Sequence, residues 1–92
     1  MIRSFAHKGL KRLYERDDAS GIGSDLVDKV RTILLQLDEA QSIDDMRMPG
    51  FRLHGLKGDK KGYWSVTVKA NWRIIFKFDD AEASDVELLN YH

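Results

Sequence analysis

The chain has 92 residues, which is enough for one small domain with a single core. It contains no cysteine, so disulfides, thiolate metal ligands and cysteine nucleophiles are excluded. Fifteen basic and fifteen acidic residues give a formal net charge of zero. No stretch resembles a signal peptide or approaches the roughly 20 apolar residues of a membrane span. We therefore predict one domain over residues 1–92 that is soluble and cytoplasmic and does not bind membranes.

The charges are distributed unevenly along the chain. Residues 47–77 carry eight Lys or Arg against one acid, Asp59, and residues 1–16 carry five against one. The other acids are concentrated in residues 17–46 and 78–92. A cationic segment of this kind attracts a polyanion even when the net charge is zero. Solvated Lys and Arg side chains on exposed faces are the alternative interpretation of the same composition.

The first half of the chain has helical periodicity. A short strand over residues 1–5 precedes a helix that begins near His7, in which apolar residues recur at three- and four-residue spacing. Basic residues cover the opposite side of this helix, and His7 has no obvious partner, so we assign His7 to the surface. A second helix follows Ser24, a suitable N-cap, and a short turn is expected over residues 42–46. The apolar stripe of the second helix is typical of a core-facing helix and comprises Leu26, Val27, Val30, Ile33, Leu34 and Leu37.

The second half changes to the two-residue period of β-strands. Residues 63–69 and 72–78 alternate in polarity and are separated by a short turn at Asn71, which predicts an antiparallel hairpin. A turn over residues 79–82 leads to a last strand over residues 86–91. The predicted fold is α+β, with two N-terminal helices packed on one face of a small, mostly antiparallel sheet.

Several residues of the second half suit cleavage of RNA. That reaction needs a base for the 2′-hydroxyl proton, cations for the charge at phosphorus, and a proton for the departing 5′-oxygen. Histidine titrates near neutral pH and can serve in either proton transfer, whereas Lys and Arg stabilise phosphoryl charge. His54 precedes a glycine-flanked basic loop, and His92 ends the chain. No metal-ligand spacing is present, so we expect a mechanism without metal and without cofactor.

Four segments of this sequence resemble a known family: Leu53–Asp59, Gly62–Val66, Asn71–Ile74 and the terminal Asn90–His92. They are similar to HigB-type toxins of the RelE/ParE superfamily, the toxin half of bacterial toxin–antitoxin pairs. The resemblance spans essentially the whole chain. It implies a RelE-like, microbial-ribonuclease-like fold and an endoribonuclease that cleaves mRNA in the ribosomal A site during translation. It also implies a helix-turn-helix antitoxin partner, HigA, through which the toxin would associate with DNA only indirectly.

The resemblance also implies roles for individual residues. The family pattern often has Asp before the terminal Tyr-His, whereas this chain has Asn90, which can orient a neighbour but cannot act as a base. The implied active-site positions are His54, Lys57, Arg73, Tyr91 and His92. Contacts to the RNA backbone are expected from Lys8, Lys11, Arg12, Lys60, Lys61 and Lys69.

The sequence leaves three functional hypotheses open. The first is a metal-free, ribosome-dependent mRNA endonuclease, in which His54 and His92 transfer protons in an undecided order. The second is a binding-only inhibitor of DNA gyrase, like the ParE branch of the superfamily, because fold alone does not separate the two. The third is a weakly active relative that is neutralised by its antitoxin, a reading that Asn90 supports.

Overall fold

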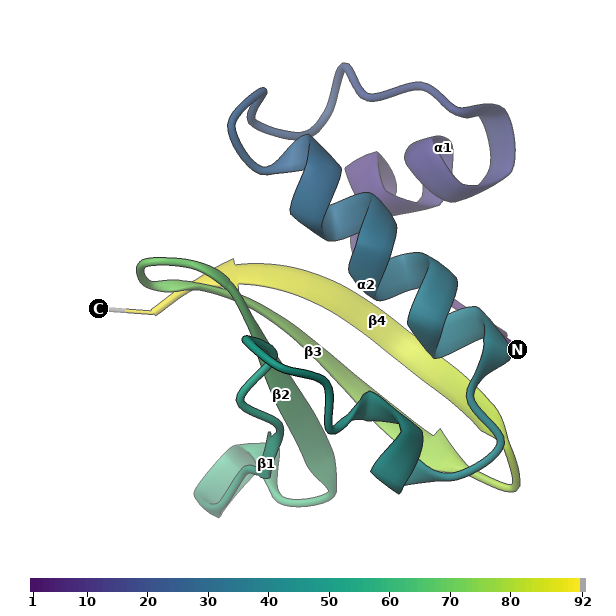
Figure 1. Cartoon of the computed structure of the whole chain (residues 1–92), viewed down its shortest axis with the longest axis vertical. Helices are drawn as coiled ribbons and strands as arrows, with labels where there is room; N and C mark the ends of the chain where they lie inside the picture. The colour runs from purple at the N-terminus through teal and green to yellow at the C-terminus, as the bar shows by residue number, and fades with distance from the viewer. Residues whose placement is uncertain (92) are drawn as a thin grey trace.

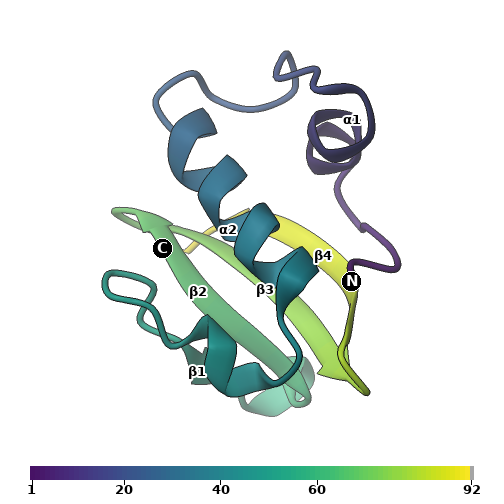
Figure 2. The ribbon, with the colours of Figure 1, turned by 45° about the vertical axis from the view of Figure 1, so that its right-hand side comes forward.

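A computed structural model describes residues 1–91. Four strands form one antiparallel sheet in the order β1-β2-β3-β4, and two helices cover one of its faces (Figures 1 and 2). The predicted α+β fold is therefore confirmed. The elements are α1 (Lys8–Arg16), α2 (Val27–Glu39), the short 3₁₀ turns η1 (Ile43–Met46) and η2 (Gly58–Lys60), and the strands β1 (His54–Gly55), β2 (Tyr63–Lys69), β3 (Trp72–Asp79) and β4 (Glu82–Asn90).

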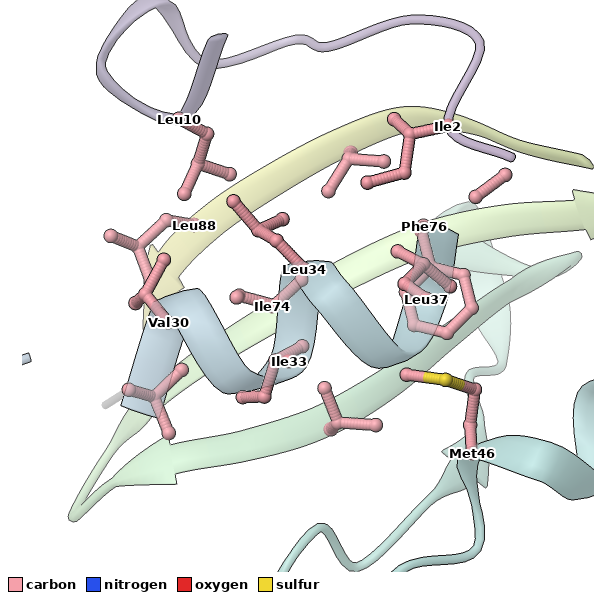
Figure 3. Close-up of a cluster of buried hydrophobic side chains, with 14 of the residues drawn as sticks. Ile2, Leu10, Val30, Ile33, Leu34, Leu37, Met46, Ile74, Phe76 and Leu88 are labelled. Carbon is pink, nitrogen blue, oxygen red and sulfur yellow. The ribbon is translucent and has the colours of Figure 1, made fainter. Parts of the chain in front are cut away.

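The core lies between α2 and the sheet (Figure 3). Ile33 and Leu37 of α2 are fully buried, as are Ile74 and Phe76 of β3, and Met46 of η1 closes one end. Alternation along the strands directs every second side chain to this helix-covered face. The apolar stripe of α2 and the antiparallel hairpin are thus confirmed. One residue departs from the alternation expected along the hairpin, because a bulge after Thr67 pairs Lys69 with Trp72 on the helix-covered face.

Neither α1 nor α2 covers the opposite face of the sheet, here called the open face (Figures 1 and 2). Ser65 and Ile75 are neighbours on this face, and both are fully buried. The Ser65 hydroxyl has no hydrogen-bond partner among the described residues. Because no helix covers them, the side chains of surrounding open-face residues must exclude water from these two positions.

Three element boundaries differ from the sequence-based predictions. The helix α2 begins at Val27 rather than after a Ser24 cap, because residues 24–26 form a turn in which the Leu26 N–H bonds to the Gly23 carbonyl. The predicted first strand is reduced to two isolated parallel bridges, from Ile2 and Phe5 to the free edge of β4. The last strand is longer than predicted and begins at Glu82. Neither helix in residues 1–91 has the length and apolarity needed to cross a membrane.

The turn between β3 and β4 stores backbone strain. Asp80 and Ala81 have φ angles of 53° and 63°, as a type I′ hairpin turn requires at both central positions. Asparagine and glycine tolerate this left-handed region, whereas the Cβ of alanine is crowded there. The tight turn is therefore built at some cost at Ala81.

Replacement of Ala81 by glycine should stabilise the fold. Glycine removes the steric strain that the Cβ of alanine has at a positive φ, and this gain outweighs the higher entropy that glycine gives the unfolded chain. We therefore expect a gain of about 0.5–1 kcal/mol in the free energy of unfolding. Urea denaturation measures this change. The matched control is Ala83→Gly, because Ala83 is fully buried within β4 without a positive φ, and glycine there should destabilise the protein. Equal effects of the two substitutions would contradict the strain argument.

His7 caps α1, and its predicted assignment to the surface without a partner was wrong. Its Nδ1 accepts a hydrogen bond from the Leu10 N–H at 3.1 Å, and its ring is half-buried. Partial burial lowers the pKa of His7 below 6.5, Glu87 opposes this shift, and Arg12 adds to it. A lowered pKa keeps Nδ1 free to accept the bond at neutral pH.

The His7 cap predicts a loss of stability in mild acid. The unfolded chain binds the proton more readily, so stability is complete above the ordinary pKa of 6.5 and falls as the pH drops toward the lowered folded value. Urea denaturation at about pH 7.5 and about pH 5.5 should reveal this decrease. His7→Asn keeps an acceptor and should flatten the dependence, whereas His7→Ala should cost about 1 kcal/mol at the higher pH. An unchanged acid dependence in His7→Asn would assign the effect to another group.

Candidate active site

His54 lies on β1, the edge strand farthest from β4, and its side chain is exposed. Its Nδ1 is 3.1 Å from the carbonyl oxygen of Arg52. A carbonyl can only accept, so in the neutral ring Nδ1 carries the proton and Nε2 presents a lone pair. Arg52 holds its carbonyl in this direction with a left-handed backbone, φ 52°. His54 is thus oriented as a proton acceptor.

Lys57 stands in the loop between β1 and β2, three residues after His54. The loop is closed by a hydrogen bond from the Leu56 N–H to the Tyr63 carbonyl at 2.9 Å. Gly58 and Gly62 have φ angles of 69° and 96°, so the loop uses glycine where its backbone is left-handed. Lys57 is exposed and precedes η2 directly, which leaves its ammonium group available next to the β1 edge.

Arg73 lies on β3 and is held by backbone carbonyls instead of by acids. Its Nη1 donates to the carbonyls of Ala70 at 2.6 Å and Trp72 at 3.1 Å. Arginine has five N–H donors, and these two bonds occupy only those of Nη1. The donors on Nε and Nη2 remain for a fork-like contact to a phosphate.

Strand register brings His54 and Arg73 to the open face together. His54 pairs with Ser65, and Thr67, two residues along β2 on the same face, pairs with Arg73. Two inter-strand steps and two residues along the strand separate the Cα atoms of His54 and Arg73 by about 12 Å. Both side chains are long enough to approach one phosphate group bound between them.

The C-terminal residues reach the same end of the sheet by a different route. The Tyr91 N–H donates to the Asn71 carbonyl at 2.8 Å, which places Tyr91 beside the tip of the β2–β3 hairpin with 36% of its surface exposed. Asn90 pairs with Trp72, whose side chain packs against the helix-side core. By alternation Asn90 lies on that face and not on the face of Arg73. His92 lies outside the described residues.

The predicted backbone-binding cations form two separate groups. Lys8, Lys11 and Arg12 are exposed along α1, on the helix side of the sheet. Lys60 and Lys61 are exposed in the loop beside β1, at the opposite end of the molecule from α1 in Figures 1 and 2. The ammonium group of Lys69 lies 3.2 Å from the Asp25 carboxylate, whose negative charge weakens the attraction of Lys69 for a polyanion.

Sequence reasoning missed Tyr63 as a functional candidate. Tyr63 begins β2 on the open face, and the Nζ atoms of Lys60 and Lys77 lie 5.4 and 5.1 Å from the centre of its ring. The alternation along residues 63–69 does place Tyr63 and Ser65 on one face of the sheet. The sequence does not show that Ser65 pairs with His54, and only this pairing places Tyr63 near His54.

An apolar groove lies between α1 and α2 and is lined in part by Tyr14, Leu34 and Leu35. It lies on the helix side of the sheet, opposite the face that carries His54 and Arg73. The Tyr14 hydroxyl donates to Asp38 at 2.8 Å, which ties the two helices together. The groove therefore takes no part in the chemistry available on the open face.

Comparison with known proteins identifies relatives along the full chain. The family described as "RelE-like toxin of type II toxin-antitoxin system HigB" matches residues 3–92. The chain is 45% identical to Endoribonuclease HigB of Proteus vulgaris over 92 residues, covering 100% of both chains. It is 34% identical to Toxin HigB-1 of Vibrio cholerae over 90 residues, covering 96% of this chain and 95% of the relative.

Solved structures share the fold at lower identity. A mutant of YafQ from E. coli superposes with a TM-score of 0.64 at 19% identity, covering 98% of this chain and 91% of that chain. A chain of the YoeB–YefM toxin–antitoxin complex from Staphylococcus aureus gives 0.63 at 19% identity, covering 100% and 95%. At these identities the likeness concerns the fold alone. The match over residues 3–92 and the two HigB relatives show that the chain belongs to the HigB-like family of RelE-like type II toxins.

Proposed function

We propose that this chain is an mRNA endonuclease that acts at the ribosomal A site and inhibits translation. The observation that carries the proposal is the arrangement of His54 and Arg73 on one open sheet face, with Nε2 of His54 available to accept a proton. The endoribonuclease of Proteus vulgaris, at 45% identity over the full length, supports the same reaction class.

The proposed reaction is a transphosphorylation within the RNA. His54 accepts the 2′-hydroxyl proton at Nε2, and the 2′-oxygen attacks the adjacent phosphorus. The bond from phosphorus to the 5′-oxygen breaks, and that oxygen takes a proton from His92, which we assign as the acid. The products are a 2′,3′-cyclic phosphate and a free 5′-hydroxyl. Atoms and charge balance with His, Lys and Arg side chains alone, so the proposed mechanism uses neither metal nor cofactor.

Arg73 and Lys57 stabilise the charge that develops at phosphorus. The carbonyls of Ala70 and Trp72 orient the guanidinium of Arg73 before the substrate arrives, so no reorganisation is needed during the reaction. Lys57 supplies a second cation from the neighbouring loop. Tyr91, beside the hairpin tip, offers a partly exposed ring on which a base can stack.

The partners of this reaction follow from charge and family. The exposed cations of α1 and of the β1–β2 loop would contact RNA backbone on the ribosome. Membership of a toxin–antitoxin family implies an antitoxin partner, and the YoeB toxin, which shares this fold, occurs in a complex with YefM. We propose a HigA-like helix-turn-helix antitoxin for this chain, through which it would associate with DNA only indirectly.

The proposed function predicts ribosome-dependent cleavage that requires His54. Purified protein should cut mRNA in a translation reaction, and primer extension should map the cuts within codons. Removal of a general base lowers the reaction rate about 10²–10⁴-fold, so His54→Ala should reduce the cleavage rate by that factor. His7→Asn is the matched histidine control on the helix side and should cleave normally. Induction of a DNA-damage response without mRNA cleavage would favour gyrase inhibition instead.

The position of Asn90 predicts that an acid there changes activity little. Asn90 is exposed on the face opposite Arg73, where a new carboxylate is screened by water. We expect Asn90→Asp to alter the cleavage rate by less than about fivefold, the effect of about 1 kcal/mol. The rates of the two proteins on one ribosome-bound mRNA measure this. A gain of two orders of magnitude would mean that the natural site is weakened by its amide.

A further inference from the structure

Tyr63 combines an aromatic ring with two cations on the open face. The ring is half-buried, and Lys60 and Lys77 approach it from η2 and from β3. Lys77 also lies 3.6 Å from Asp85, whereas Lys60 forms no ion pair among residues 1–91. A stacking ring for bases beside an uncompensated ammonium group for phosphates is the combination found where proteins bind single-stranded nucleic acids.

The position of Tyr63 relative to His54 follows from the register. Tyr63 and Thr67 lie on either side of Ser65 along β2, and Ser65 pairs with His54. Arg73 pairs with Thr67, so Tyr63 lies on the other side of His54 from Arg73. Two residues of strand span about 7 Å, which is within the reach of one extended nucleotide. A strand of RNA cleaved between His54 and Arg73 can therefore continue onto the Tyr63 ring.

A purely structural role for the ring explains less. The β1–β2 loop is already closed by the backbone bond from Leu56 to Tyr63, without help from the lysine contacts. Exposed cation–π contacts are weaker than stacking of a base on an aromatic ring. An arriving nucleotide can thus displace Lys60 from the ring and receive its ammonium group at the phosphate.

Nearby acids do not cancel this attraction. Asp85 and Lys77 are both about half-exposed, so their pair is weak and easily exchanged. Glu87 shares the row of His54 but lies on β4, at the opposite edge of the sheet from β1. Lys57, Lys60 and Lys61 outnumber Asp59, the one acid of their loop, so positive charge dominates the β1 side.

We propose that Tyr63 is a stacking platform for the nucleotide that flanks the cleaved bond, and that Lys60 binds the phosphate of that nucleotide. The inference rests on the proposed cleavage of RNA and specifies its substrate contacts. Stacking depends on the size of the base and not on its hydrogen-bonding pattern. Tyr63 therefore confers a preference for purine over pyrimidine at the flanking position.

The test is a double-mutant cycle between the protein and the RNA. Ribosomes are programmed with mRNAs that carry adenine, uracil or an abasic site at the flanking nucleotide, and kcat/KM is measured for each. Removal of the base should reduce kcat/KM for the wild-type protein about tenfold, within the range for one stacked base. Tyr63→Phe should behave as wild type. Tyr63→Leu should be equally slow with and without the base, because each change removes the same contact.

Independent losses would overturn the proposal: if Tyr63→Leu and the abasic site reduced kcat/KM multiplicatively, the ring and the base would not meet. Binding of His54→Ala protein to the same ribosomes separates this question from catalysis. Binding that depends jointly on Tyr63 and the base, without cleavage by wild type, would refute the proposed function and retain the stacking site. Binding that is independent of Tyr63 would refute the stacking site alone.

Lys60 and Lys61 provide a matched pair of charge variants. Lys60 contacts the Tyr63 ring, whereas Lys61 is exposed next to it in the same loop. Lys60→Gln should reduce the difference in kcat/KM between adenine and abasic RNA. Lys61→Gln should weaken binding to both RNAs equally. Thermal unfolding of each variant excludes a folding defect, and Tyr63→Phe retains the ring if Tyr63→Leu is unstable. Equal behaviour of the two lysine variants would remove Lys60 from the proposed site.

Discussion

The alternation of side chains between the two faces of the central strands is the constraint on which the rest of the structure depends. Val66, Ile74 and Phe76 must face α2, because their burial supplies the core. Once these residues point to the helix, Ser65, Ile75 and Arg73 must point away from it. A register slip of one residue would expose the core and bury the cations. The same apolar contacts that fold the chain therefore fix the open face.

Neutral carbonyls orient His54 and Arg73 on the open face. His54 is held by the Arg52 carbonyl, and Arg73 by the carbonyls of Ala70 and Trp72. A carbonyl fixes direction without cancelling a full positive charge, so the attraction for phosphate is retained. Lys69 differs, because Asp25 accepts from its ammonium group. Arg73 therefore keeps its positive charge without an acidic partner among residues 1–91, whereas Lys69 links the hairpin to the loop before α2.

The sequence predicted those features that depend on apolar periodicity and missed those that depend on register or on local backbone geometry. The stripe of α2 and the alternation of the hairpin follow directly from hydrophobic spacing. The early start of β4 was missed because Glu82–Asp85 is polar, and Asp85 with φ 52° interrupts its alternation. The cap formed by His7 was missed because histidine is not among the usual capping residues. The pairing of His54 with Ser65, and the separation of Asn90 from Arg73, required the strand partners.

Two of the six non-glycine residues with a positive φ among residues 1–91 orient the candidate active site. Arg52 and Ala70 have φ angles of 52° and 51°, and their carbonyls are the ones that accept from His54 and Arg73. A non-glycine residue in this region costs on the order of 1–2 kcal/mol. Two such residues therefore lower the free energy of unfolding of a small domain substantially. Glycine would relieve the strain but would also let each carbonyl change direction. Strain of this kind persists where the surrounding structure over-determines it, and here it fixes the orientation of His54 and Arg73, the proposed proton acceptor and the proposed phosphate-binding cation.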